Sequence, residues 1–353
     1  MLVFDRDGLT IEIAPFAITP SGTAPDDKTS FYHAPFPLLD VADPSIFDDV
    51  KTYRQSSTVA RNAPIVWYSP NWLHWWGGGI YTILRFAKLI ADHGTKTIIY
   101  VYDNKGFPTL AKLRADRNMT HPGHNIEITT DITSLPIGHI AIATTHQSVF
   151  SVLRAPPCAA RFYFMQGYES LLYAGGTQAE QANSTYQLGF KGICGGDWLR
   201  SIFQSYGGKA TKFDFSIDSK VFYPGRPVRK NVETLFFFGR PASDRRMYDF
   251  GAAALTAIHA KHPDVKIVIA GLDDLPELPF PAEYLGNMQI EDTGDLYRTV
   301  DVGLTLSGSN LSYLPLEFMA CGVPVLTNKG SQLSWYSFGK QLLRSRVGFC
   351  ARF

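Results

Sequence analysis

Between residues 64 and 103 the sequence alternates in a way that restricts the fold to one class. PIVWYSP is a short apolar run, WWGGGI is rich in glycine, YTILRFAKLIADHG repeats apolar residues at helical spacing, and TKTIIYVYD is apolar again. Short apolar runs bounded by turn residues indicate buried strands, and apolar residues three or four apart indicate an amphipathic helix. The order strand, glycine loop, helix, strand is that of a parallel crossover unit. The segment therefore predicts an α/β fold built on a parallel sheet.

The same alternation fills the rest of the chain in two blocks. Further strands of the first block are predicted at 139–147, 161–169 and 190–196, with helices near 177–188 and 197–206. A segment rich in proline and charge follows at 215–230, and strands and helices then alternate again up to residue 328. Closely spaced prolines disfavour long helices before residue 60. We predict an N-terminal extension over 1–60 and two Rossmann-like parallel-sheet domains, over 61–222 and 223–353.

The composition is that of a folded protein with little net charge. With 353 residues, 45% of them hydrophobic, the chain can bury two cores. Its 33 basic and 32 acidic side chains create no overall field that would attract nucleic acid, which is therefore not expected as a partner. Four cysteines lie far apart without CxxC spacing, so we expect neither a zinc site nor a disulfide framework, and a cytoplasmic location. No signal peptide or membrane-spanning segment is predicted.

Three glycines, Gly77, Gly78 and Gly79, precede the first predicted helix. Without side chains they allow the backbone to approach a ligand closely and to point free amides at it. The alternative is a plain tight turn. The spacing is not that of the dinucleotide fingerprint, so a nicotinamide cofactor is not expected.

Arginines follow the first predicted strand of the second block, in the segment GRPASDRR. Arg240 comes directly after the strand, and Arg245 and Arg246 lie just before or within the first turn of the next helix. Guanidinium groups beside a helix N-terminus favour binding of a diphosphate. The alternative is a solvated run of charges in which Asp244 is the partner.

The segment SGSNLSYLPLEFMACGVPVLTN, residues 307–328, contains a single carboxylate, Glu317. Ser309 and Asn310 belong to a loop of small polar residues that suits the wall of a binding pocket. Glu317 follows in the first turn of a short helix, where it could accept hydrogen bonds from sugar hydroxyls. Interaction with the helix dipole alone is the alternative explanation for this carboxylate.

Several of these segments resemble those of a known enzyme family. FFFGRP, YRTVDVGLTLS and LPLEFMACGVPVLTN are similar to segments of retaining GT-B glycosyltransferases of the family 4 type, and the resemblance covers about residues 64–330. FYFMQGYESLLYAGG and STYQLGFKGICGGDWL resemble the WsaF-like rhamnosyltransferase branch. The resemblance implies a GT-B fold whose two domains face a cleft, and transfer of L-rhamnose from dTDP-β-L-rhamnose onto a bacterial surface glycan.

The resemblance also implies a role for each candidate residue. Glu317 matches the glutamate that holds the ribose hydroxyls, and Ser309 stands where family members usually carry another glutamate, which contacts the donor sugar. The remaining matches are a diphosphate clamp at Arg240 with Arg245 or Arg246, a glycine loop at Gly78 and Gly79, and a histidine near the sugar at His146. The serine could tune donor choice or mark lost activity.

The mechanism that the resemblance implies places no demand on a metal or other cofactor. The departing diphosphate gains charge, and fixed arginines and amides would stabilise that charge more in the transition state than in the ground state. In retaining enzymes of this type the acceptor attacks from the face that the diphosphate leaves, and the donor phosphate takes the acceptor proton. The one DxD-like triplet, residues 5–7, lies in the extension, so no metal site is expected.

Two other functions stay open at this point. Only about 25 residues follow the last predicted strand, so the second domain is expected to be incomplete, and the first glutamate is replaced. A catalytically weak, nucleotide-binding scaffold of a glycan assembly complex would fit these departures, as would a GT-B sugar-nucleotide epimerase. The expected partners are a nucleotide-sugar donor and a glycan acceptor, which leaves open a peripheral association with a membrane-linked acceptor.

Overall fold

The computed structural model describes residues 59–75, 77–120, 126–225, 231–271, 276–310, 313–328, 332 and 350–352. All of these residues belong to one compact unit, residues 37–353. The expected N-terminal extension, apart from residues 59 and 60, lies outside the described residues.

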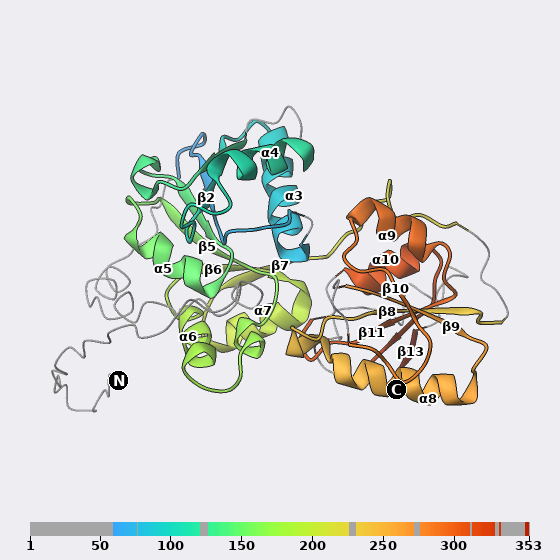
Figure 1. The fold of residues 1–353 in the computed structure, drawn as a ribbon. Coiled ribbons are helices and arrows are strands. Elements are labelled where there is room, and N and C mark those ends of the chain that lie inside the picture. Colours follow the sequence, from blue (N-terminus) through green and yellow to red (C-terminus); the bar gives the residue numbers. More distant parts are fainter. Residues whose placement is uncertain are drawn as a thin grey trace, which may run out of the picture. The chain divides into compact units, whose positions relative to one another are not determined.

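A first sheet of parallel strands forms between residues 65 and 213 (Figure 1). Its strands are β1 (Ile65–Ser69), β2 (Thr97–Val101), β3 (Ile126–Thr129), β4 (Ile140–Ala143), β5 (Ala160–Met165), β6 (Lys191–Gly195) and β7 (Ala210–Phe213). They lie in the order β3-β2-β1-β4-β5-β6-β7, and every pairing is parallel. The connections contain α3 (Gly78–Asp92), α4 (Leu110–Thr120), the turn η2 (Ile132–Ser134), α5 (His146–Arg154), the turn η3 (Glu169–Leu172), α6 (Thr177–Thr185) and α7 (Gly196–Ser205).

The second sheet repeats this order with its own strands. These are β8 (Thr234–Phe238), β9 (Lys266–Ala270), β10 (Glu283–Tyr284), β11 (Val302–Thr305), β12 (Val325–Thr327) and β13 (Cys350–Arg352). They lie in the order β10-β9-β8-β11-β12-β13, again in parallel. The turn η4 (Asp244–Arg246) and the helices α8 (Tyr248–Lys261), α9 (Ile290–Tyr297) and α10 (Leu314–Ala320) connect them.

Both faces of each central strand are buried, which explains why these strands are apolar throughout. In β1, Val66 and Tyr68 pack into one core while Trp67 packs into the other, together with Leu84 and Ala87 of α3. Alternate side chains of a strand point to opposite faces, so a strand covered by helices on both sides must be apolar at every position.

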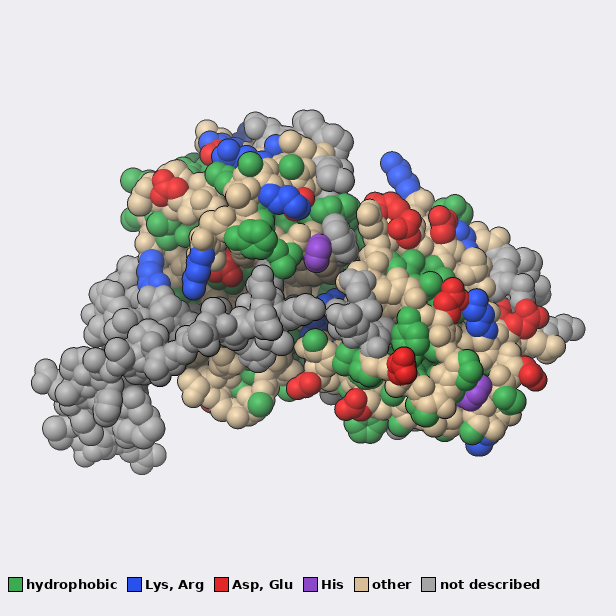
Figure 2. Space-filling view, in the orientation of Figure 1, with side chains coloured by type: hydrophobic (Ala, Val, Ile, Leu, Met, Phe, Trp, Pro, Cys, Tyr) green, Lys and Arg blue, Asp and Glu red, His purple; other side chains and the backbone are tan. Residues whose placement is uncertain are grey.

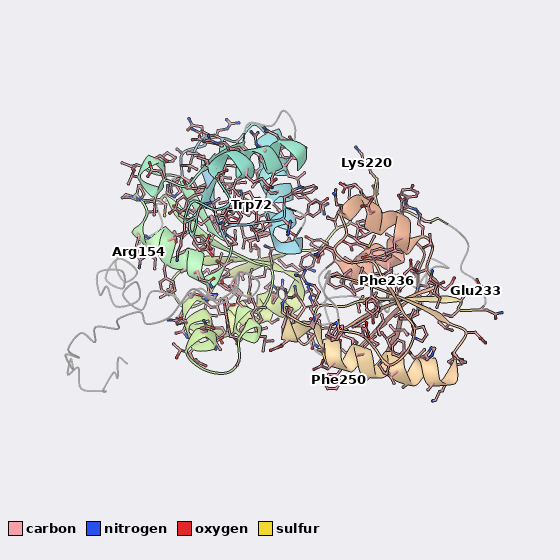
Figure 3. All side chains as sticks on the ribbon, viewed as in Figure 1. Trp72, Arg154, Lys220, Glu233, Phe236 and Phe250 are labelled. Carbon is pink, nitrogen blue, oxygen red and sulfur yellow. The ribbon has the colours of Figure 1, made fainter. Side chains whose placement is uncertain are left out.

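The second sheet is covered in the same way, with α8 on one face and α9 and α10 on the other (Figure 1). Phe236 packs against Tyr297 and Phe318, with ring centroids 5.5 Å apart in both pairs. Its neighbour Phe237 points the other way, to Tyr248 of α8. In Figure 3, Phe236 lies inside this domain and Phe250, which is 70% exposed, lies on its surface.

The predicted α/β class and the two Rossmann-like parallel sheets are confirmed, but several boundaries differ. The strand predicted over 139–147 ends at Ala143, because Thr145 begins α5. The Thr145 side chain accepts from the backbone of Ser148, and the Ser148 side chain in turn accepts from the backbone of Thr145, a reciprocal cap that starts a helix. His146 is therefore the first residue of a helix. Likewise, Gly78 and Gly79 are the first residues of α3 and do not precede it.

The expected incompleteness of the second domain concerns residues 329–353, of which the structure describes Gln332 and β13. β13 pairs in parallel with β12 and extends the second sheet. At the other end of this domain, Phe222 already packs into its core, next to Phe236 and Tyr297. The proline-rich segment therefore contributes to the second core before β8 begins.

Candidate functional site

The strand order of each sheet reverses once, and the predicted site residues follow the strands at these points. In the first sheet the reversal lies between β1 and β4, and in the second it lies between β8 and β11. Gly78 follows β1, His146 follows β4, Arg240 follows β8 and Ser309 follows β11. Open parallel sheets bind ligands beyond the carboxyl ends of their strands at such reversals. The topology therefore gathers the candidates where a ligand is expected.

The arginine loop after β8 lies directly beside the loop after β11. Arg240 is half-buried, and its guanidinium lies 5.9 Å from the ring centre of Phe238. Arg245 and Arg246 form the turn η4, which Met247, at φ 51°, separates from α8. The backbone carbonyl of Arg245 accepts from Gly308 N–H at 2.8 Å. Arg245 and Arg246 are thus held on a separate turn that precedes α8.

The serines of the loop after β11 are buried within the loop itself. Ser307 Oγ donates to the carbonyl of Asn310 at 2.9 Å and accepts from Ser309 N–H at 3.2 Å. Asn328 holds the loop from the end of β12, accepting from Ser307 N–H and donating to its carbonyl, both at 2.9 Å. Ser309 is only 1% exposed. These polar groups fix the shape of the loop.

Asn310 connects this loop with the first sheet. Its side-chain amide donates to the backbone carbonyl of Gln166, just after β5. The side chain of Gln166 donates in turn to the carbonyl of Gly79 at 3.2 Å. The structure therefore brings Asn310 and Gly79, two of the predicted donor-binding residues, to the same short chain of hydrogen bonds.

Glu317 is a half-buried carboxyl group on α10 without a hydrogen-bond partner for its side chain among the described residues. Burial raises its pKa from 4.5 to about 8, and the charge of Arg85 opposes this only in part. Tyrosines surround it: its charge helps to raise the pKa values of Tyr81, Tyr297 and Tyr313. An acceptor that is taken from water and left without donors costs free energy. A ligand that donated hydrogen bonds to Glu317 would therefore reduce this cost.

A hydrogen bond close to Glu317 joins its helix to α3. Thr82 Oγ1 donates to the hydroxyl oxygen of Tyr313 at 3.1 Å, and Tyr313 is the residue before α10. Thr82 Oγ1 also lies 2.7 Å from the carbonyl of Gly78. The first turn of α3, which contains the predicted glycines, is in this way tied to the helix that carries Glu317.

His146 is part of a buried pair whose other member the sequence did not reveal. Its ring Nδ1 and its backbone N–H both lie 2.8 Å from Oε2 of Glu169. His146 is 2% exposed and Glu169 is 7% exposed. Glu169 falls at the end of the predicted strand 161–169, but the strand stops at Met165 and Glu169 begins η3. A carboxylate in the segment that follows an apolar strand was the signal that could have identified it.

The described residues place no group of three His, Cys, Asp or Glu side chains where they could hold a metal ion. The DxD-like triplet at 5–7 lies outside them. Nor does this part of the chain contain a helix that is long and apolar enough to cross a membrane. On the face drawn in Figure 2, acidic and basic side chains are interspersed, in keeping with their nearly equal numbers.

Comparison with known proteins shows similarity to one family model and to one curated relative. Residues 233–347 match the family model "WsaF, C-terminal domain". The chain is 33% identical, over 308 residues, to the "O-antigen biosynthesis protein RfbC" of Myxococcus xanthus. That match covers 82% of this chain and 24% of the relative, so the chain spans about a quarter of the length of that protein.

Solved structures with the same fold cover most of the chain. Anabaena Alr3699/HepE in complex with UDP gives a TM-score of 0.56 at 15% identity, covering 82% of this chain and 85% of that one. A glycosyltransferase from Rickettsia africae ESF-5 gives a TM-score of 0.54 at 14% identity, and the match covers 83% of this chain and 85% of that one. At this level of identity the likeness concerns the fold. Together with the two parallel sheets it confirms the predicted GT-B fold.

Proposed function

We propose that this chain transfers a hexosyl group from a nucleotide sugar to a growing bacterial surface glycan. The observation that carries the proposal is Glu317, a half-buried carboxyl group on α10 without a hydrogen-bond donor among the described residues. The hydroxyls of a nucleotide ribose are donors of the kind it lacks. Support comes from the GT-B fold, and from the relative whose name assigns it to O-antigen biosynthesis.

The proposed donor is dTDP-β-L-rhamnose. Support comes from the match of residues 233–347 to a domain described as part of WsaF, the branch that the sequence itself resembles. The HepE structures offer the competing donor, since one of them contains UDP-glucose. A deoxyribose presents only its 3′-hydroxyl to Glu317, whereas a ribose presents two hydroxyls. Both donors therefore belong in every test.

In the proposed reaction the arginines act on the leaving group. Arg240 and the η4 pair, Arg245 and Arg246, would hold the diphosphate as its negative charge grows, which lowers the barrier because the attraction is strongest in the transition state. Gly78 and Gly79 would allow the first turn of α3 to approach the donor closely. Transfer with retention, in which the donor phosphate takes the acceptor proton, needs no metal. We propose that this reaction takes place in the cytoplasm and that the protein associates peripherally with a membrane-linked acceptor.

Isotope-traced transfer tests the proposal. The protein is incubated with labelled dTDP-rhamnose or UDP-glucose and with glycan prepared from a bacterial cell envelope. We expect label in the glycan with dTDP-rhamnose and with the anomeric configuration of the donor. Binding without turnover would indicate a scaffold protein, and isomerised nucleotide sugar without an acceptor would indicate an epimerase. Either result contradicts the proposed transfer.

A further inference from the structure

The pair formed by His146 and Glu169 is a buried polar arrangement in the first domain that the proposed reaction has not yet used. Oε2 of Glu169 accepts from both the backbone N–H and the ring Nδ1 of His146 at 2.8 Å. Oε1 accepts from the hydroxyl of Tyr163 at 2.7 Å. Both carboxylate oxygens are therefore occupied, and the carboxylate is held from two elements, α5 and β5.

The surroundings leave the imidazole ring little freedom. The reciprocal cap between Thr145 and Ser148 fixes the backbone of His146 at the start of α5. The ring packs edge-on against Tyr173, with ring centres 5.4 Å apart. Glu169 is fixed in turn, because its backbone N–H donates to the hydroxyl oxygen of Tyr186 at 3.2 Å. A ring held in this way presents its second nitrogen in one direction.

The hydrogen bond to Glu169 decides the state of that second nitrogen. A carboxylate only accepts, so Nδ1 carries the hydrogen, and in the neutral ring Nε2 has a free lone pair. No described residue hydrogen-bonds Nε2, which lies on the side of the ring away from Glu169. His146 begins the helix after β4, beside the reversal of the first sheet, so the residue lies at the edge where ligands of such sheets bind.

The pair is not explained by stability. Burying a carboxylate costs several kcal/mol before its partners compensate, and well-packed apolar side chains usually serve a core equally well. The surrounding core is otherwise rich in aromatic and aliphatic residues. A buried polar network in which both acidic oxygens are used, and one ring nitrogen is left over, fits a role in orienting that nitrogen.

We propose that Glu169 is a positioning residue: it holds His146 in the Nδ1–H tautomer so that Nε2 can hydrogen-bond a hydroxyl group of the transferred hexose. The proposal rests on the proposed function for the identity of the ligand, but the effect of Glu169 on the ring does not. The ionisable groups that face the pair from neighbouring elements are Tyr102, Tyr163, Tyr173 and Tyr186. Burial raises the pKa of Tyr102, Tyr163 and Tyr186 well above the usual range, so these three are neutral and place no charge beside the pair.

Two measurements on the full chain test the proposal. The first records the ¹⁵N signals of the histidine rings in the wild type and in Glu169→Gln, with those of His146 assigned by their loss in His146→Gln. We expect the Nδ1–H tautomer in the wild type, and a mixture of tautomers in Glu169→Gln, since an amide can donate as well as accept. The second titrates both proteins with dTDP and with dTDP-rhamnose. We expect Glu169→Gln to weaken dTDP-rhamnose about tenfold and to leave dTDP unchanged.

Tyr163→Phe is the matched control. It removes a hydrogen bond from the same buried carboxylate without touching the contact to His146, so it should lower the melting temperature and leave the His146 tautomer and the sugar preference as in the wild type. If Glu169→Gln does not fold, Glu169→Asp is measured in its place, since it keeps the charge and withdraws the carboxylate from the ring.

The outcomes separate the two proposals. Unchanged His146 signals in the Glu169 variants, or an equal loss of affinity for dTDP and dTDP-rhamnose, would overturn the positioning role. A wild type that binds neither compound contradicts the proposed function and, with it, the sugar-facing role of Nε2. In that case the tautomer measurement alone still decides whether Glu169 orients the ring.

Discussion

At the scale of single residues, two ionisable groups of the candidate site, Glu317 and Arg240, have no ion-pair partner among the described residues. Glu317 has no described hydrogen-bond partner, and burial raises its pKa to about 8. Arg240 has its cation over the ring of Phe238, and no described carboxylate forms an ion pair with it. Groups of this kind lower the stability of the free protein. A ligand of opposite charge or hydrogen-bonding character restores that stability when it binds.

The raised pKa of Glu317 predicts how stability changes with pH. Between about 4.5 and about 8 the folded chain retains a proton on Glu317 that the unfolded chain has released. Stability falls with rising pH wherever the folded state binds more protons, so this group costs stability progressively across that range. Glu317→Gln removes the titration and should flatten this part of the profile. Melting temperatures of both proteins from pH 4 to 9 test it, and parallel profiles would show that Glu317 is not buried as described.

The diphosphate clamp is tested at Arg240. Arg240→Ala should weaken binding of dTDP about tenfold to a hundredfold, because a charged hydrogen bond contributes about 1.5–3 kcal/mol. Its melting temperature in the absence of ligand should not fall. The matched control is Arg61→Ala, since Arg61 is exposed and lies before β1, away from the sheet edge that holds the clamp. Equal dTDP affinity in Arg240→Ala and the wild type would remove Arg240 from the site.

At the scale of elements, two helix starts and one turn contain several of the candidate site residues. α3 begins at Gly78, α5 begins at His146, and η4 holds Arg245 and Arg246. The central strands were predictable because fully buried parallel strands are apolar along their whole length. The start of α5 was not, since no proline or glycine separates it from β4 and only the Thr145 cap marks where the helix begins. Glu169 was missed for a related reason, because its partner is 23 residues away in the sequence.

Substitution by alanine is expected to have opposite effects at Gly79 of α3 and Gly251 of α8. A Cβ on Gly79 would meet nothing closer than Gln166 at 3.9 Å, so Gly79→Ala should stabilise α3 by about 0.5–1 kcal/mol. A Cβ on Gly251 would lie 2.2 Å from the ring of Phe237, so Gly251→Ala should destabilise the packing of α8. If a donor approaches α3 closely, Gly79→Ala also weakens donor binding despite its higher stability. Chemical denaturation and dTDP-rhamnose titration measure both effects, and a stabilised Gly79→Ala that binds normally would leave the glycines as a plain turn.

At the scale of the whole molecule, two sheets of the same strand order supply different parts of the proposed chemistry. The second sheet carries the groups suited to a nucleotide, Glu317 and the arginines, while the first carries His146 and its partner Glu169. The chain corresponds to about a quarter of the Myxococcus xanthus relative, and the fold it shares with solved structures is GT-B. Binding of a nucleotide sugar through Glu317 is therefore central to the proposed function.

Calorimetric titration of dTDP-rhamnose and UDP-glucose into the wild type and Glu317→Ala, at pH 7 in two buffers of different ionisation enthalpy, tests this claim most directly. Hydroxyl donors favour the ionised carboxylate, so binding should lower the pKa of Glu317 from about 8 and release a proton. We predict binding of dTDP-rhamnose in preference to UDP-glucose, proton release in the wild type, and a loss of about tenfold to a hundredfold in affinity without proton release in Glu317→Ala. Binding that is equal in both proteins, or no binding of either nucleotide sugar, would contradict it.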